Sequence, residues 1–441
     1  MGIEGVFSSV VGGDGVRARV LELIADASAK AGRHAVDINV MMFSFTDPLI
    51  ADALASAARQ PGLNVRLIAD WTARGVDGHQ QVGRLAQLRL PSLSVRYKKD
   101  QPYVWDATAA HIRWSYRASR GLLHHKTVSV VVDGEPWRLI CGSFNWTAKA
   151  VHSYENILIL TDSTAECRDI MSRVELEFEA LWSDGRCSLS PDEAQAHYES
   201  IIDIYHRDPM TAPNSIDGLA HGRDDALNVL NSRYYSSSDS VPHILGSDPV
   251  VIAFSACLPH EEKSRAGYAE SNNRRYISLR SPSGRVKRAP LTITALALDV
   301  IFRAGPGETL LIAMHGLSQR IPEYGALLDA ARRGVFLRIL LDGKLGDRAI
   351  ESLSQVLRRE PLPIRVKQGF RMMHQKYIVN VNSCTVLTGT ANLSTDASGR
   401  HSEHRLRVIG NENLASQFAA DFEIIWNRVK TQVPVEPGEK N

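Results

Sequence analysis

The chain has 441 residues, a formal net charge of +2, 44% hydrophobic residues and 23% charged residues. This length suits two domains of roughly 200 residues each, with a core large enough to need no disulfide staples. Five cysteines without a CxxC pair argue against a disulfide framework or a structural zinc site, and reduced thiols fit a cytoplasmic protein. The small net charge does not indicate a nucleic-acid-binding protein, because affinity for a phosphate backbone comes from clustered Lys and Arg.

The sequence shows no secretory signal and no transmembrane segment. The N-terminus lacks a basic stretch followed by an apolar core, and no run of about 18 apolar residues occurs. We therefore expect a cytoplasmic protein.

The first half predicts a strand, a helix and a second strand. Residues 36–45 are apolar and indicate a buried strand, residues 47–59 a helix with Asp47 as N-cap, and residues 63–70 the next strand. This order at this spacing is typical of a parallel strand pair. A long helix at about residues 163–182 closes the half.

A variable stretch separates the halves. It contains a helix-like piece at residues 191–205, followed by a Ser/Asp/Asn-rich part. We divide the chain into an N-terminal domain (1–185), a linker (186–248) and a C-terminal domain (249–441). The Arg- and Ser-rich residues 261–288 predict a loop or hairpin near the active face.

The second half repeats the order of the first. Residues 309–314 predict a strand, 324–333 a helix, 335–342 a strand and 413–426 a closing helix. A weak internal repeat of this kind predicts an α/β fold with two similar domains.

Each half also carries the same polar motif. His124 and Lys126 stand two residues apart, as do His374 and Lys376. Side chains two apart on a strand share a face, so each half presents an imidazole and an ammonium together.

Each His-x-Lys segment is followed by a Gly-Ser/Thr turn and then by a glutamate. These elements contribute Ser143, Asn145 and Glu155 in the first half, and Thr390, Asn392 and Glu403 in the second. Two imidazoles, two ammonium groups and two carboxamides would form a cationic pocket that complements a phosphodiester and its transition state. One imidazole could attack phosphorus while the other protonates the leaving oxygen, and no carboxylate cluster suited to a metal is visible.

The paired motifs resemble the HxK…GSxxN motifs of the phospholipase D superfamily, over about residues 36–182 and 309–426. The resemblance implies two αβα-sandwich domains related by a pseudo-two-fold axis, with one active site at their interface. It also implies a covalent phosphohistidine intermediate, no metal or other cofactor, and a monomer, because one chain supplies both histidines.

The resemblance assigns roles to individual residues. His124, Lys126 and Asn145 would act together with His374, Lys376 and Asn392. Glu155 and Glu403 would orient an imidazole, as the carboxylate of a catalytic triad does, or would be ordinary salt-bridge partners. Ser143 and Thr390 would bind a phosphate oxygen or brace the turn.

One position departs from the superfamily pattern. The usual Asp five residues after the Lys is replaced by Val131 and Val381, with Asp133 and Asn382 slightly further on. This departure argues against close membership of the standard lipase branch. Asp70 and Asp342 end matching strands, and we expect them to cap the loops that follow.

Arginine and aromatic residues interleave immediately before His124. Arg113, Trp114 and Arg117 are candidate substrate-binding residues, because such a strip suits phosphate contact and base stacking. The alternative is a solvated loop. A second basic group, with Arg274, Arg275, Arg280, Arg285, Lys287 and Arg288, is more typical of a solvated face.

Three functional hypotheses follow. The leading one is a metal-independent nuclease that acts through phosphohistidine, favoured by the short turns and the basic-aromatic strip. The alternative is a phospholipid hydrolase or phosphatidyl transferase. A catalytically silent module that binds phosphate or nucleic acid is disfavoured, because all six His, Lys and Asn residues are present.

Overall fold

The structure is a computed structural model. It describes residues 2–74, 80–100, 102–106, 108–114, 121–183, 188–207, 244–245, 248–255, 276–280, 286–319, 321–342, 364–367, 371–399 and 401–429.

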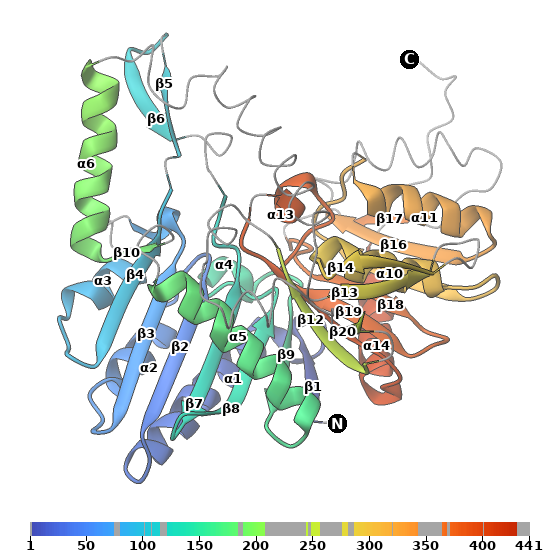
Figure 1. Cartoon of the computed structure of the whole chain (residues 1–441), viewed down its shortest axis with the longest axis horizontal. Coiled ribbons are helices and arrows are strands. Elements are labelled where there is room, and N and C mark those ends of the chain that lie inside the picture. Colours follow the sequence, from blue (N-terminus) through green and yellow to red (C-terminus); the bar gives the residue numbers. More distant parts are fainter. Residues whose placement is uncertain are drawn as a thin grey trace.

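Two mixed sheets lie side by side and form the frame of the protein (Figure 1). The N-terminal sheet has the order β1-β9-β8-β7-β2-β3-β4-β10. Its strands are β1 (Ile3–Phe7), β2 (Val36–Met42), β3 (Leu63–Ala69), β4 (Leu93–Lys98), β7 (Lys126–Val132), β8 (Glu135–Gly142), β9 (Asn156–Thr161) and β10 (Ser188–Leu189).

The C-terminal sheet has the order β12-β20-β19-β18-β15-β16-β17. Its strands are β12 (Val250–Phe254), β15 (Thr309–Met314), β16 (Phe336–Asp342), β17 (Ile364–Lys367), β18 (Lys376–Asn380), β19 (Thr385–Gly389) and β20 (His404–Val408). Each of its strands has a counterpart at the same place in the N-terminal sheet, and among the described residues only β10 has no equivalent in the C-terminal sheet. The predicted α/β fold with two similar halves is confirmed.

Helices cover the outer face of each sheet. In the N-terminal half these are α1 (Ser8–Ala31), α2 (Pro48–Ala57) and α3 (Gln81–Gln87), and in the C-terminal half α10 (Ile293–Arg303) and α11 (Pro322–Arg332). The predicted N-cap is confirmed, since the Asp47 carboxylate accepts hydrogen bonds from the backbone N–H groups of Leu49 and Ile50. The sequence analysis did not predict α1, although Val16, Val20, Leu23 and Ala27 form a buried stripe at helical spacing.

The closing helices α5 (Ala165–Ser183) and α14 (Glu412–Arg428) pack in a core that both halves share. α14 contacts β1 of the other half, and α5 contacts β12 of the other half. Phe418 on α14 lies edge-on against Phe7 of β1 and Tyr377 of β18, with ring centroids 4.7 and 5.0 Å apart. The two halves are therefore joined by a continuous hydrophobic core.

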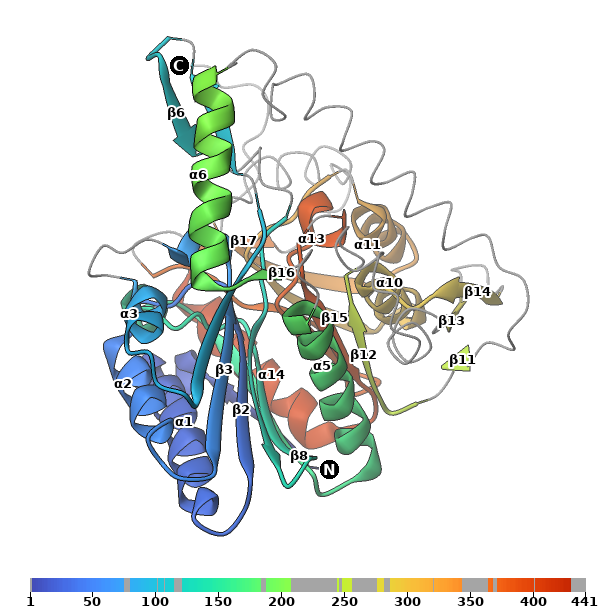
Figure 2. The ribbon, with the colours of Figure 1, turned by 60° about the vertical axis from the view of Figure 1, so that its left-hand side comes forward.

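An arm rises from the N-terminal half on the side where α6 and β6 are labelled (Figure 2). α6 (Pro191–Arg207) packs Ile201 and Tyr205 against the hairpin of β5 (Tyr103–Asp106) and β6 (His111–Trp114). β10 and α6 fall within the stretch predicted as a linker, and β10 pairs with β4. Residues 208–243 of that stretch lie outside the described residues.

For the polar residues 261–288 the sequence predicted a loop or a hairpin, and the structure shows a hairpin that begins within this stretch and ends just before α10. Its strands are β13 (Tyr276–Arg280) and β14 (Val286–Pro290), which pair antiparallel.

We expect Phe418→Ala to lower the free energy of unfolding by about 3–5 kcal/mol, because it opens a cavity in the shared core. Phe336→Ala is the matched control, since the Phe336 side chain is 63% exposed, and should cost less than about 1 kcal/mol. Urea unfolding of both variants measures the difference. Equal costs would contradict a core that spans the two halves.

Candidate active site

The two His-x-Lys segments occupy equivalent places in the two sheets. Lys126 is the first residue of β7 and pairs with Met42 on β2, while Lys376 is the first residue of β18 and pairs with Met314 on β15. Each histidine lies two residues earlier, where the chain enters the strand. The same register in both halves places both imidazoles at the same end of their sheets.

The segments of one half run beside those of the other. The His124 N–H donates to the carbonyl of Ser402, and the His374 N–H donates to the carbonyl of Tyr154, both at 3.0 Å. Each histidine thus lies next to the glutamate segment of the opposite half, and the site forms at the interface.

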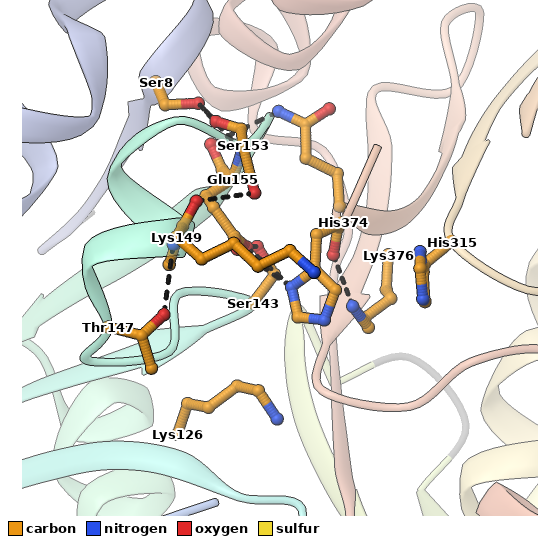
Figure 3. A network of polar contacts seen from close by, with 12 residues as sticks. Ser8, Lys126, Ser143, Thr147, Lys149, Ser153, Glu155, His315, His374 and Lys376 are labelled. Carbon is orange, nitrogen blue, oxygen red and sulfur yellow. Dashed lines mark hydrogen bonds and ion pairs between the residues drawn. The ribbon is translucent and has the colours of Figure 1, made fainter. Parts of the chain in front are cut away.

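The carboxylates pair crosswise with the imidazoles. His124 Nδ1 lies 2.9 Å from Glu403 Oε2, and His374 Nδ1 lies 3.0 Å from Glu155 Oε2. An ionised carboxylate can only accept, so beside the ionised glutamate each Nδ1 carries the hydrogen and each Nε2 keeps its lone pair. Figure 3 shows His374 between Glu155 and Lys376.

The two lysines are buried beside the imidazoles. Lys126 Nζ donates to the His124 carbonyl at 2.7 Å, and Lys376 Nζ donates to the His374 carbonyl. Burial lowers the pKa of Lys126 to about 7 and that of Lys376 to about 8. An anion placed between them would raise both pKa values again, because it favours the charged ammonium.

Burial also controls the other titratable groups. It lowers the pKa of His124 and His374 well below the usual value, with a further contribution from both lysines. Burial raises the pKa of Glu155 to about 8. The site is therefore a desolvated group of ionisable side chains, as expected for acid–base and nucleophilic chemistry.

The glycine turns need glycine. Gly142 has a φ of +155° and a Cβ there would lie 2.3 Å from the Asn156 carbonyl oxygen, while Gly389 has a φ of +152° and a Cβ there would lie 2.3 Å from the His404 carbonyl oxygen. Only glycine fits such an approach.

Ser143 and Thr390 are buried behind these turns. Ser143 Oγ donates to Glu155 Oε2 at 2.5 Å and accepts from the Asn156 N–H, and Thr390 Oγ1 accepts from the His404 N–H. These contacts favour bracing of the turn over binding of a phosphate oxygen. The neighbouring carboxamides, of Asn145 and Asn392, each have an Oδ1 atom without a partner among the described residues.

Asp70 and Asp342 hold the approach to the histidines. Asp70 Oδ2 accepts from the Leu123 N–H at 2.7 Å, and Asp342 Oδ2 accepts from the Met373 N–H at 3.0 Å. Both therefore brace the residue before a histidine, and Asp70 also caps the loop after its own strand by accepting from the N–H and Oγ1 of Thr72. The loop after Asp342 lies outside the described residues.

The positions that depart from the superfamily pattern lie at the far end of β7 and β18. Asp133 contacts His34 and the Ala35 N–H, and Asn382 accepts from the Thr309 N–H. Neither side chain belongs to the site. Val131 and Val381, which replace the usual Asp, lie near the ends of β7 and β18 that are opposite to Lys126 and Lys376.

Three further residues that the sequence analysis missed lie beside the histidines. The His315 ring is 5.0 Å from that of His374, and the His401 ring is 5.8 Å from that of His124, measured between centroids. The side chain of Lys149 extends toward His374 (Figure 3). His315 directly follows β15. Its position at the end of a strand that both halves share could have identified it in the sequence as a site residue.

The predicted substrate strip is only partly described. Arg113 Nε lies 3.1 Å from Asp106 Oδ2, so its charge is partnered within the arm. Arg117 and the Trp114 side chain lie outside the described residues, as do the side chains of the second basic group.

Within the described ranges, no group of three or more His, Cys, Asp or Glu side chains could hold a metal ion. No helix among the described residues is long and apolar enough to span a membrane.

Comparisons with known proteins agree with this geometry. The family described as "Cardiolipin synthase, PLD-like domain" matches residues 23–182 and 300–426, which is more than half of the chain. Mitochondrial cardiolipin hydrolase of Xenopus laevis is 30% identical over 147 residues, 33% of this chain and 55% of that protein. The human protein of the same name is 27% identical over 181 residues, 41% of this chain and 56% of that protein. The chain thus spans about half the length of these relatives.

The whole fold has a counterpart in a solved structure. Phosphatidylserine synthase of Haemophilus influenzae Rd KW20 superposes with a TM-score of 0.57 over 98% of this chain and 87% of that one, at 13% identity. At this identity the likeness concerns the fold alone.

The site predicts anion binding that weakens with rising pH. Sulfate keeps its charge between pH 6 and 9, so a change in its affinity over this range reflects the titration of protein side chains. Its binding should take up protons above about pH 7 and weaken at least about tenfold between pH 7 and pH 9, because Lys126 and Lys376 lose their charge in that range. Glu155 also weakens sulfate binding as the pH rises, because its carboxyl group becomes negatively charged around pH 8.

Calorimetry in buffers of different ionisation enthalpy measures the uptake. Lys126→Met and Lys376→Met should each reduce it, whereas Lys99→Met, at an exposed lysine, should not. Affinity that is constant over this pH range would contradict the buried, partly neutral lysines.

Proposed function

Because the chain belongs to the phospholipase D superfamily, we propose that it cleaves or transfers the phosphodiester of a glycerophospholipid through a covalent phosphohistidine. The observation that carries the proposal is the crosswise pairing of two imidazoles with two carboxylates around two buried lysines.

The reaction divides into two displacements. A bound phosphodiester anion favours the doubly protonated form of one imidazole, which then carries a hydrogen on Nε2 as well as on Nδ1. Nε2 of the other, neutral imidazole attacks phosphorus, the bond to the leaving oxygen breaks, and the imidazolium gives that oxygen its Nε2 proton and becomes neutral. In the second step the acceptor hydroxyl returns a proton to the same imidazole while its oxygen attacks phosphorus, and the phosphorus–nitrogen bond breaks. Lys126 and Lys376 stabilise the charge on the equatorial oxygens in both steps.

A lipid substrate has more support than a nucleic acid. The curated relatives are named cardiolipin hydrolases. In the predicted base-stacking strip, the charge of Arg113 is paired with that of Asp106. The nuclease hypothesis therefore becomes an outcome of the test, and cardiolipin is the first substrate to try.

Vesicles of cardiolipin or phosphatidylglycerol, single-stranded DNA and RNA, each with EDTA, distinguish the substrates. We expect lipid turnover that EDTA does not abolish, and loss of at least about 10³-fold in His124→Ala and His374→Ala. His34→Ala, at an exposed imidazole at the far end of the sheet, should keep full activity. Intact lipid with degraded nucleic acid would sink the lipid proposal.

The crosswise carboxylates give a second prediction. Glu403→Gln and Glu155→Gln should lower kcat by about 10²–10⁴-fold with little loss of stability, because a neutral amide holds the imidazole tautomer poorly and does not stabilise imidazolium. Glu175→Gln is the matched control, a carboxylate held by Ser129 and Asn39 away from the site. If the two site variants turned over substrate at the control's rate, the carboxylates would have only a structural role.

A further inference from the structure

The two halves of the pseudo-symmetric site differ at the position that follows β2 and β15, beside the imidazoles. Phe43 follows β2 and its N–H donates to the His125 carbonyl at 3.0 Å, while His315 follows β15 and its N–H donates to the Gln375 carbonyl at 3.1 Å. The Phe43 ring lies 4.9 Å from that of His124 at 59°, and the His315 ring lies 5.0 Å from that of His374 at 63°. The two rings are equivalent in place and differ in chemistry.

The orientation of His315 is fixed by its backbone contact. Its Nδ1 lies 2.8 Å from the Met373 carbonyl oxygen, which can only accept. Nδ1 therefore carries the hydrogen and Nε2 carries a lone pair. Burial and the nearby Lys376 lower the pKa of His315 to about 3, so this lone pair is kept at neutral pH.

We propose that His315 positions the water molecule that His374 deprotonates, and so favours hydrolysis over transfer to an alcohol. This inference rests on the proposed function. It makes His124 the nucleophile and His374 the acid and base.

The hydrogens of the acceptor explain the selectivity. One O–H of the water gives its proton to His374 Nε2 as the oxygen attacks phosphorus and the bond between phosphorus and His124 Nε2 breaks. The other O–H donates to His315 Nε2. An alcohol has a single O–H, which His374 takes, so it gains nothing from the lone pair of His315. Phe43 offers no such acceptor beside His124.

A purely structural role for His315 is the competing explanation, since its bond to Met373 braces the residue before His374. Two substitutions separate the roles. His315→Asn keeps a donor near the position of Nδ1 and loses Nε2, whereas His315→Gln keeps a polar atom near Nε2 and loses the donor at Nδ1. His315→Phe reproduces the ring that the other half has.

The experiment follows hydrolysed and transferred products from cardiolipin or phosphatidylglycerol vesicles in the presence of a primary alcohol, by mass spectrometry. We expect His315→Phe and His315→Asn to lower hydrolysis about tenfold, the factor for one lost hydrogen bond, with transfer changed much less. The ratio of transferred to hydrolysed product should therefore rise about tenfold, and His315→Gln should restore part of the hydrolysis. Phe43→Leu, the matched control, should leave the ratio unchanged.

Two results would overturn the inference. One is an unchanged product ratio in His315→Phe, and the other is wild-type hydrolysis in His315→Asn, which would assign the structural role. Absence of any lipid turnover in the wild-type protein is a different outcome, because it refutes the proposed function itself.

Discussion

The crosswise hydrogen bonds between imidazole and carboxylate are the constraint on which the rest of the site depends. Each half supplies a histidine that its own glutamate does not touch, and receives a glutamate from the other half. Neither half has an oriented imidazole by itself. The shared core, in which each closing helix contacts the edge strand of the opposite half, holds the two segments at the required distance.

Desolvation explains why so many ionisable groups can be close together. In water the two lysines would be charged, with a pKa near 10.5, and would repel each other. Buried here, they have pKa values of about 7 and 8, and Glu155 has one of about 8, so the empty site holds less charge than its residue count implies. A phosphodiester bound beside the two lysines would raise both pKa values again, because an anion favours the charged ammonium.

Much of this arrangement could be predicted from the sequence. The repeated His-x-Lys and Gly-Ser/Thr motifs predicted the two halves and the six central residues, and a period of two on a strand explains why the His and Lys of each motif lie together. The interface between the halves was implied by the resemblance to the superfamily. The glycines of the turns belong to the same motifs, and the structure gives their reason: Gly142 and Gly389 approach the neighbouring strand too closely for any Cβ.

The rest depends on tertiary packing. Which glutamate meets which histidine is a matter of register between the halves, which no local pattern encodes. His315 and His401 stand at positions where the other half has Phe43 and Ser153, so a search for repeated residues passes over them. The sequence did not predict that Asp70 and Asp342 brace the residues before the histidines, because their carboxylates accept from the backbone N–H groups of Leu123 and Met373, which lie far along the chain.

The joining of both halves in one polypeptide has a genetic consequence. In a homodimer built from one such unit, every mutation appears on both sides of the axis, so a change that helps one histidine must be tolerated by the other. Here Phe43 and His315 are encoded separately, and each can change without its counterpart. With both halves in one polypeptide, the two sides of one reaction centre can therefore differ, as Phe43 and His315 do.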